Sequence, residues 1–373
     1  MIISALKSND PKDHRSPIHP DTISALTSLN AEVNFESGIG KGINSDDSVF
    51  ENLGLKSFSR SECLEKSDLL ITNQPISVEE ISSMKKGSTL IGMVSPFTNQ
   101  ELINACATSN INLVSMEFIP RITRAQKMDV LSSQANLAGY AAVIESAKHL
   151  STALPMMMTA AGTLKPARVF VIGVGVAGLQ AMATAKRLGA RVEAFDTRPA
   201  VEEQVKSLGA RFIKIDIGET EETDQGYAKE LTEKQLELQR EGMKKVCGYS
   251  DIVITTAQVF GKPAPRILSG DMISSMQPGS VIVDMAVTSG GNVEGSVLGE
   301  TVEKNGVKII GHENLPGYVP EHSTQVYASN IYNLIEEFWD KDTKKLELDE
   351  SDEILKSCIV TKDGNYISEI LRR

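Results

Sequence analysis

One segment constrains the fold of this chain more than any other: residues 168–196, which read RVFVIGVGVAGLQAMATAKRLGARVEAFD. An apolar run leads directly into three glycines with the spacing GxGxxG, and a helical pattern of small and apolar residues follows. Gly173 permits a tight turn, Gly175 lets the backbone approach a pyrophosphate, and Gly178 lets the helix lie close to a sheet. The free N–H groups at the start of that helix attract phosphate. The segment therefore predicts a strand–turn–helix that binds a dinucleotide through Gly173, Gly175, Val176, Ala177 and Gly178.

The second apolar run of this segment ends in an acid, Asp196. A carboxylate at this place can accept hydrogen bonds from the ribose hydroxyls of adenosine and repels a 2′-phosphate, so we expect NAD(H) rather than NADP(H). Arg198 works against this expectation, because an arginine nearby can neutralise a phosphate. A glycine turn in an α/β fold that binds no ligand is the structural alternative.

Short apolar runs alternate with helical patterns along the chain, which is typical of parallel α/β layers. The later runs form a six-stranded doubly wound series. We therefore predict an α/β chain of two Rossmann-like domains, each a parallel doubly wound sheet, joined by long crossing helices. The expected domains are 1–130 plus 318–373, and 131–317 as the NAD(H)-binding domain. The expected strands are 69–72, 89–94 and 112–116, followed by 168–172, 191–195, 211–214, 251–255, 280–284 and 307–310.

Two helices and a charged segment complete this organisation. From about Val130, the sequence LSSQANLAGYAAVIESAKHLSTAL predicts one long helix that crosses between the domains. The helix SNIYNLIEEFWDK is expected to pack back on the first domain, because the second sheet is complete by then. The segment KDTKKLELDESDEI is strongly charged, and we expect it to be loosely held.

Charge and cysteine content exclude several classes of protein. The chain has 38 basic and 49 acidic side chains and a net charge of −11, which argues against nucleic acid or anionic membrane as the main partner. Its four cysteines form no CxxC pair, so buried thiols in a reducing cytosol are favoured over a disulfide framework or a zinc site. The five histidines fit no metal-binding spacing. We expect a soluble chain with no metal, because neither a signal peptide nor a membrane span is apparent.

Other stretches offer candidate functions with alternatives. Residues 218–246 form a long charged insertion, which is either a lid or a solvated loop followed by a surface helix. Asp284 ends an expected strand at the edge where ligands bind, and it either contacts a ligand or caps the turn. Gln258 and Val259 follow the fourth strand of the second sheet and are expected over the adenine or ribose of the cofactor. His312 follows the last strand and is placed to face the same cleft, although a structural histidine is the commoner outcome.

Residues 121–129, RITRAQKMD, crowd two arginines, a lysine, a glutamine and an aspartate into nine positions. By composition alone, this stretch is the solvated first turn of the long helix that follows. Arg124 and Lys127 are expected to face solvent or a partner.

Several motifs carry a family resemblance: GVGVAGLQA, AFDTRPAVEEQVKSLGA, GYAKE, TTAQVFGKPAP, GSVIVDMAVTSGGN and RITRAQKMD. Over residues of about 60–340, they resemble the NAD(H)-binding portion, domain I, of proton-translocating nicotinamide nucleotide transhydrogenases, which are related to alanine dehydrogenases. Alanine dehydrogenases carry a lysine and a histidine for substrate binding and acid–base work. Here Asn73 stands near the expected lysine, and LIGMVSPF has no histidine. Hydride exchange between two nicotinamides needs neither group, because no proton moves at the carbon centre.

The resemblance implies roles for RITRAQKMD. Arg121 would contact the nicotinamide end of NAD(H), and Gln126 would bridge toward the nicotinamide nucleotide held by a partner. Asp129 and Ser132 would complete this polar cluster. The candidate catalytic residues are therefore Arg121, Gln126, Asp129 and Ser132. The residues of this loop expected to bind the cofactor are Gln126, Lys127, Met128 and Asp129.

Elsewhere, the resemblance implies that the motif Asp196, Thr197 and Arg198 binds the adenosine ribose. It also implies that Gly226 and Tyr227 belong to a mobile loop that closes over bound nucleotide. Tyr318 departs from the family pattern, in which a small residue or an arginine is expected after LPG.

The resemblance further implies the activity and the partners. The chain would be a soluble α1-type subunit, a homodimer, that transfers a hydride from NADH to NADP⁺ held on a β subunit. Membrane-embedded α2-type and β subunits would couple this transfer to inward proton translocation and would attach the cytoplasmic chain to the inner (plasma) membrane. The end at DGNYISEILRR, without membrane helices, favours this split arrangement over a fused one. The alternatives are an amino-acid dehydrogenase of the alanine dehydrogenase type and a non-catalytic NAD(H)-sensing module.

Overall fold

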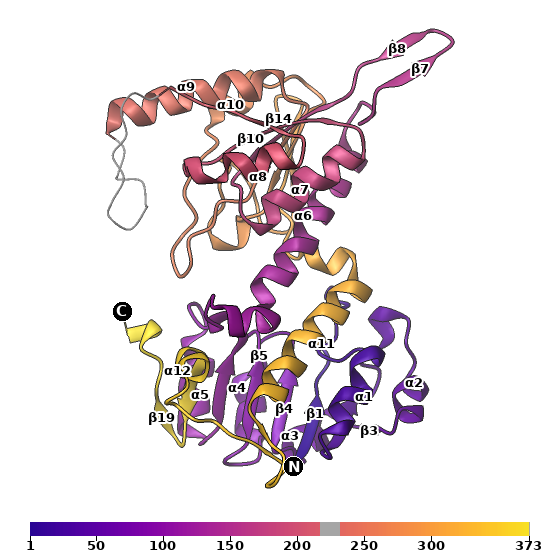
Figure 1. Ribbon diagram of the computed structural model, residues 1–373, viewed down its shortest axis with the longest axis vertical. Helices are drawn as coiled ribbons and strands as arrows, with labels where there is room; N and C mark the ends of the chain where they lie inside the picture. The colour runs from indigo at the N-terminus through magenta and orange to yellow at the C-terminus, as the bar shows by residue number, and fades with distance from the viewer. Residues whose placement is uncertain (217–231, 373) are drawn as a thin grey trace. The chain divides into compact units, whose positions relative to one another are not determined.

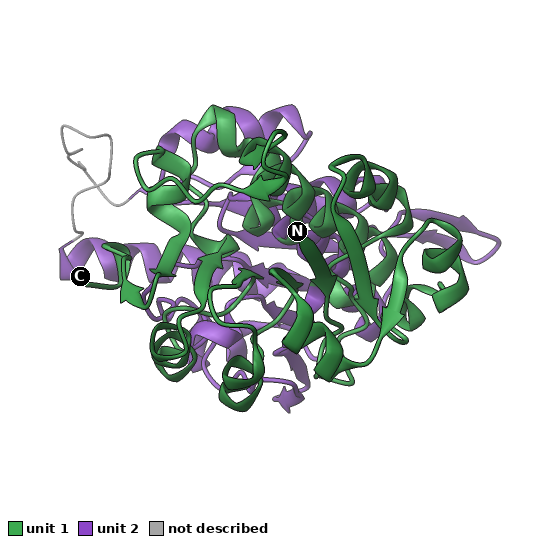
Figure 2. Ribbon diagram, turned by 90° about the horizontal axis from the view of Figure 1, so that it is seen from below, with its two compact units in different colours: residues 1–134, 316–373 green, residues 135–315 purple. Residues whose placement is uncertain are grey.

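The computed structural model describes residues 1–216 and 232–372 (Figure 1). The chain divides into two compact units, which Figure 2 shows in different colours. Unit 1 consists of Met1–Gln134 and Pro316–Arg373, and unit 2 consists of Ala135–Leu315. The chain therefore leaves unit 1 once, forms the whole of unit 2, and returns.

Unit 1 is built on an eight-stranded sheet that is parallel except at one edge, where β18 pairs antiparallel with both β6 and β19. The strands expected at 69–72, 89–94 and 112–116 are present, although the second and third end at Gly92 and Ser115. The other five are short runs that sequence reasoning missed. In sheet order, the strands are β19 Asn365–Tyr366, β18 Ile359–Lys362, β6 Asn112–Ser115, β5 Thr89–Gly92, β4 Leu69–Thr72, β1 Ile2–Ala5, β2 Glu32–Glu36 and β3 Lys56–Phe58.

Helices pack on this sheet around a single apolar core. The helix α11, Pro320–Glu337, contributes Tyr327, Ile331 and Leu334 to that core, which confirms that the chain packs back on the first sheet. It also contacts α1 and the 3-10 helix η3. The remaining helices of unit 1 are α1 Pro20–Ser28, α2 Asp47–Asn52, α3 Arg60–Lys66, α4 Val78–Ser83, α5 Gln100–Thr108 and α12 Glu353–Cys358, with the 3-10 helices η1 Lys41–Ile43, η2 Met116–Phe118, η3 Thr123–Met128 and η7 Ile370–Arg372.

The charged segment 341–354 is not loosely held, contrary to expectation. It contains β17 (Lys345–Leu346), which pairs with β16 (Trp339–Asp340), and it leads into α12. Asp352 accepts the backbone N–H of Ile354 at 2.8 Å and caps that helix. The charges of the segment stay at the surface while a few apolar side chains anchor it, and β18 follows α12 directly.

Unit 2 contains a seven-stranded sheet in which six parallel strands have the doubly wound order of dinucleotide-binding domains. All six were expected, with the third shortened to Arg211–Phe212. The seventh strand, β14, was not expected, and it pairs antiparallel with β15 at the edge. In sheet order, the strands are β11 Arg211–Phe212, β10 Arg191–Phe195, β9 Arg168–Ile172, β12 Ile252–Thr255, β13 Val281–Asp284, β15 Val307–Ile310 and β14 Thr301–Lys304.

The long helix α6, Val130–His149, carries the chain from unit 1 into unit 2. It ends before the predicted end at residue 154, and Pro155, which cannot continue a helix, follows shortly. A hairpin of β7 (Met157–Thr159) and β8 (Gly162–Leu164) comes next, and Figure 1 shows it projecting from the rest of unit 2. The other helices of unit 2 are α7 Val176–Arg187, α8 Glu202–Ser207, α9 Glu233–Tyr249 and α10 Gly270–Ser275, with the 3-10 helices η4 Pro199–Val201 and η5 Val287–Ser289, and with η6 Leu315–Tyr318 at the return to unit 1.

The two faces of the unit 2 sheet bury separate apolar clusters. Val169 and Val171 of β9 pack on the side of α7, and Phe170 of the same strand packs on the side of α9. A strand covered on both faces explains why RVFVI is almost wholly apolar. Within the two described ranges of the chain, no helix has the length and apolar content that a membrane crossing needs.

Candidate functional site

The glycine-rich turn joins β9 to α7 and has no room for larger residues at two of its three glycines. Gly173 has a φ of 102°, and a Cβ there would lie 2.5 Å from the Thr256 hydroxyl. A Cβ at Gly178 would lie 1.9 Å from the carbonyl oxygen of Gly173. A Cβ at Gly175 would meet no protein atom within 4 Å. The first and third glycines therefore serve packing, and the second faces open space at the start of α7, which fits a pyrophosphate.

Asp196 follows β10 and holds its largely buried carboxylate beside this turn. One oxygen, Oδ2, accepts the backbone N–H of Val174 at 2.7 Å and Nη2 of Arg198 at 2.9 Å. The other, Oδ1, accepts the backbone N–H and Nε of Arg198, each at 2.9 Å. Burial raises the pKa of Asp196, but these hydrogen bonds and the charge of Arg198 outweigh burial and hold that pKa below its ordinary value. The carboxylate is therefore ionised at neutral pH, and all four of its acceptor positions are filled.

The loop after β12 lies against the glycine-rich turn. Thr256 donates its hydroxyl to the carbonyl of Gly173 at 3.1 Å. Asn292, which is fully buried, donates to the carbonyls of Ala257 and Pro265 at 2.8 Å each and accepts the N–H of Ala257 at 3.1 Å. Sequence analysis missed Asn292, because its only signal is its place after the two glycines of TSGGN.

Gln258 belongs to the same loop and is exposed, as a cofactor contact must be. Its side-chain amide donates to the carbonyl of Met285 at 3.1 Å. Asp284, by contrast, is a cap and not a ligand contact. Its buried carboxylate accepts the N–H groups of Ala286 at 3.0 Å and of Asn292 and Val293 at 3.1 Å each, so it fixes the turn after β13.

The stretch RITRAQKMD is not the first turn of α6, which begins only at Val130. Thr123–Met128 form the separate 3-10 helix η3. Ala125 and Met128 are fully buried, and their spacing of three matches the period of a 3-10 helix. Arg121 and Gln126 are exposed at the surface of unit 1. A buried anchor thus holds a short helix whose polar residues remain accessible.

Arg124 and Lys127 are both exposed, as expected, and each also forms an ion pair within unit 1. Arg124 pairs with Asp352 at the start of α12 and lies 3.8 Å from a carboxylate oxygen of Glu337. Lys127 places Nζ 3.0 Å from the other oxygen of Glu337. The carbonyl of Lys127 also accepts Nδ2 of Asn330 at 2.9 Å. Both cations are therefore engaged in holding η3 onto the C-terminal part of unit 1.

Asp129 and Ser132 form the start of α6. The Asp129 carboxylate accepts the backbone N–H of Ser132 at 2.9 Å and its hydroxyl at 2.6 Å. This arrangement is a helix N-cap, and a negative charge at a helix N-terminus is favourable. The two residues therefore have a structural task, and their role in hydride transfer stays a prediction.

Asn73 follows β4 and is buried in a polar network. It donates to Oδ2 of Asp13 at 3.3 Å and to the carbonyl of Arg15 at 3.4 Å. Arg15 holds the same Asp13 carboxylate through Nε and Nη2 at 2.8 and 2.7 Å, and donates to Gln134 at 2.9 Å. Burial raises the pKa of Asp13, but its hydrogen bonds and the charge of Arg15 outweigh burial and lower that pKa. This part of unit 1 therefore contains the neutral amide of Asn73 and the guanidinium of Arg15, which is paired with Asp13.

The remaining candidate residues are placed as follows. Thr197 is exposed beside Asp196. His312 accepts the backbone N–H of Asn314 at its Nδ1, at 3.2 Å. Tyr318 lies in η6 and is 44% exposed. The predicted mobile-loop residues Gly226 and Tyr227 lie outside the described residues.

Comparison with known proteins finds relatives that span the chain. Models described as the N-terminal and C-terminal domains of alanine dehydrogenase/PNT match residues 6–138 and 142–369. The chain is 44% identical over 379 residues to a Rhodospirillum rubrum protein named as the first portion of NAD(P) transhydrogenase subunit alpha, over 100% of this chain and 99% of that protein. A transhydrogenase structure from Sinorhizobium meliloti matches with a TM-score of 0.89 and 41% identity, over 98% of this chain and 100% of that one. An L-alanine dehydrogenase structure matches with a TM-score of 0.84 but 21% identity, over 100% and 98% of the two chains, which shows the fold alone.

Proposed function

The chain belongs to the family of NAD(P) transhydrogenase alpha subunits, within the wider alanine dehydrogenase/PNT family, and we propose that it binds NAD(H) and passes a hydride from NADH to NADP⁺ on a partner subunit. One observation carries the cofactor side of this proposal. An ionised carboxylate, Asp196, stands beside a glycine-rich turn whose central glycine faces open space.

The Asp196–Arg198 pair supports NAD(H) over NADP(H). Arg198 directs its guanidinium to the Asp196 carboxylate through two nitrogens. The carboxylate largely neutralises the charge of Arg198, which is then not available to pair with a phosphate. A 2′-phosphate would meet the negative charge of Asp196, whereas ribose hydroxyls could donate to it by replacing hydrogen bonds from Arg198. Together with Thr197 these residues would hold the adenosine end, while Gly175, Val176 and Ala177 would hold the pyrophosphate and Gln258 would lie near adenine or ribose.

The nicotinamide supplies the chemistry when NADH is bound, because its ring carries the hydride. The chain's own residues then need only orient that ring and exclude water. We assign this task to the exposed Arg121 and Gln126 on η3, with Asp129 and Ser132 fixing the point where η3 ends and α6 begins. Lys127 and Met128 would support the loop, since one is paired and the other is buried.

The rest of the proposed complex follows from the family. A β subunit would hold NADP(H), and it would couple hydride transfer to inward proton translocation together with an α2-type membrane subunit. This chain would be attached peripherally to the cytoplasmic face of the inner (plasma) membrane through these subunits.

The proposed homodimer has a candidate contact surface in the β7–β8 hairpin. Its strands are exposed along their whole length, and Met156 and Met158 are 61% and 84% exposed. Projecting apolar side chains of this kind are typical of surfaces that a partner covers. A second copy of this chain is the occupant that we propose, and Met158→Glu is expected to turn a dimer into a monomer in sedimentation experiments.

Reconstitution tests the hydride-transfer proposal directly. The purified chain is mixed with the NADP(H)-binding domain of the β subunit, NADH and an analogue of NADP⁺ whose reduction is followed optically. We expect transfer that requires both proteins. Tight NADH binding without transfer would refute the enzymatic proposal and favour a sensing module.

A second arm addresses the amino-acid dehydrogenase alternative. The chain alone is incubated with NAD⁺ and L-alanine, and NADH formation is followed. We expect none, because Asn73 places a buried amide near the expected lysine, and LIGMVSPF has no histidine. Rapid NADH formation would establish the alternative.

A further inference from the structure

A cavity of about 540 Å³ lies in unit 2, at the end of the sheet opposite to the glycine-rich turn. Arg168, Arg191 and Arg211 line it, and they are the first residues of β9, β10 and β11. The glycine-rich turn follows the last residue of β9, so the length of the strand, about 15 Å, separates the two places. The cavity therefore does not belong to the dinucleotide site.

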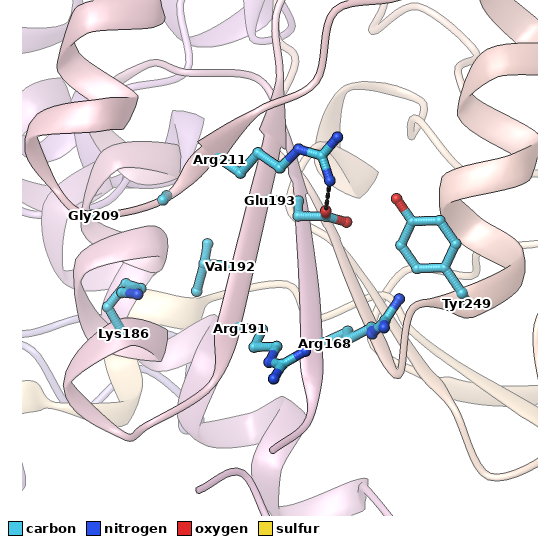
Figure 3. Close-up of a pocket in the computed structure, with 9 residues that line it drawn as sticks. Arg168, Lys186, Arg191, Val192, Glu193, Gly209, Arg211 and Tyr249 are labelled. Atoms are coloured by element: carbon cyan, nitrogen blue, oxygen red, sulfur yellow. Dashed lines mark hydrogen bonds and ion pairs between the residues drawn. The ribbon is translucent and has the colours of Figure 1, made fainter. Parts of the chain in front are cut away.

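The register of the strands gathers these side chains on one face. Arg191 is the partner of Arg168 across the sheet, and Glu193 is the partner of Arg211. Residues two apart on a strand point to the same side, so Arg191 and Glu193 share that face. Figure 3 shows the three arginines around the cavity, with the Glu193 carboxylate between Arg211 and Tyr249.

The charges in the cavity are unbalanced. Lys186 of α7 joins the three arginines, and Glu193 is the one acid among the lining residues. Arg211 pairs with Glu193 at 3.4 Å. The other three cations, Arg168, Lys186 and Arg191, form no ion pair with any residue in 1–216 or 232–372. Neighbouring like charges repel one another, and an anion that binds among them removes this cost.

Two contacts hold the wall of the cavity in place. The Arg168 guanidinium lies over the ring of Tyr249, 4.9 Å from the ring centre. Asp251 directs its carboxylate to the backbone N–H of Arg168 at 2.7 Å and not to the guanidinium, which stays available. Burial, with Glu193 as a hydrogen-bond partner and nearby charge, raises the pKa of Tyr249 to about 12, so this hydroxyl stays protonated. The site thus combines planar guanidinium donors with an aromatic edge.

We propose that this cavity is a second anion site, which binds a small molecule with two or more phosphate groups. Guanidinium groups form paired, charge-assisted hydrogen bonds with phosphate oxygens, and several of them favour a multiply charged ligand over a single carboxylate. The volume lies in the range of small-molecule sites. The chain's net charge of −11 disfavours an extended polyanion such as RNA or an anionic membrane.

Pyrophosphate serves as the probe, measured by titration calorimetry on the full chain at physiological ionic strength. Because pyrophosphate can also reach the glycine-rich turn, the comparison is between variants. Arg168→Gln/Arg191→Gln removes two cavity charges, and Arg187→Gln/Arg240→Gln removes two surface charges elsewhere in unit 2. We expect the cavity variant to lose one binding event or to weaken it at least tenfold, and the control pair to change it less than twofold.

Glu193→Gln gives the reverse test, because it removes the acid while keeping the shape of the side chain. It is expected to tighten pyrophosphate binding several-fold, which a merely structural role would not do. Circular dichroism confirms that each variant is folded. Equal pyrophosphate binding by the wild type and the cavity variant, or equal weakening in the control pair, would overturn the proposal. Cavity-dependent binding of RNA or of phosphatidylglycerol vesicles without pyrophosphate binding would overturn it as well.

Discussion

The glycines Gly175 and Gly178 offer a matched pair of substitutions that are expected to differ in their effect on stability. An alanine Cβ at position 178 would lie 1.9 Å from the carbonyl oxygen of Gly173, about 1 Å closer than any ordinary contact, and that oxygen belongs to the backbone. Overpacking of this kind costs about 3 kcal/mol. Gly178→Ala is therefore expected to lower the free energy of unfolding, and with it NADH binding.

Gly175→Ala is expected to leave stability nearly unchanged, because its Cβ meets no protein atom within 4 Å and Gly175 has an ordinary φ of −88°. Alanine in place of glycine at a helix N-cap costs only about 0.5 kcal/mol. The new methyl group would occupy the space that a pyrophosphate needs. Loss of one charge-assisted hydrogen bond, about 1.5–3 kcal/mol, weakens binding roughly 10- to 100-fold.

Urea titration gives the stability of both variants, and NADH fluorescence gives their affinities. Wild-type NADH affinity in Gly175→Ala would show that the pyrophosphate does not approach this glycine. Wild-type stability in Gly178→Ala would show that the turn has room for a methyl group, contrary to the 1.9 Å approach.

Three further changes test other regions of the site. Gln126→Asn shortens the side chain by one methylene. It is expected to slow hydride transfer about 10²-fold in single-turnover experiments while changing NADH binding little. Equal losses in transfer rate and NADH affinity would instead show that η3 only binds the cofactor. Asp196→Asn is expected to weaken NADH roughly 10- to 100-fold and to reduce discrimination against NADPH, and unchanged discrimination in titrations would exclude Asp196 as its source. Asp13→Asn is expected to lower stability at neutral pH, because the folded pKa of Asp13 is depressed by Arg15. That contribution is present above the ordinary pKa of about 4 and is lost as pH falls through the folded pKa, so urea curves of wild type and variant should converge in acid.

Local sequence was enough to locate the elements that bury continuous apolar runs. β9, β10 and the turn between β9 and α7 could be predicted because strand, glycines and helix follow one another without interruption. The antiparallel β18 could not, because its place is set by pairing with β6, far away in the sequence. Nothing in IVTK itself indicates that partner.

The candidate site shows the same division. The composition of RITRAQKMD indicated a solvated helix start, whereas Arg124 and Lys127 find their partners at Asp352 and Glu337. The sequence alone does not show ion pairs between residues that are distant in the chain, so such charged residues are predicted to be solvated. Asn292 escaped notice for a related reason, since its three hydrogen bonds go to a loop that precedes it by a whole strand.

The carboxylate of Asp196 already has hydrogen-bond donors at all of its acceptor positions, and Arg198 supplies three of the four hydrogen bonds. A ribose that binds to Asp196 must therefore replace hydrogen bonds from Arg198, which lies in the same loop. The measured affinity for the nucleotide then reflects the difference between the ribose–Asp196 hydrogen bonds that form and the Arg198–Asp196 hydrogen bonds that break. A change at Arg198 would therefore alter the affinity for ribose through the hydrogen bonds that ribose must replace, while the Asp196 carboxylate itself stays the same.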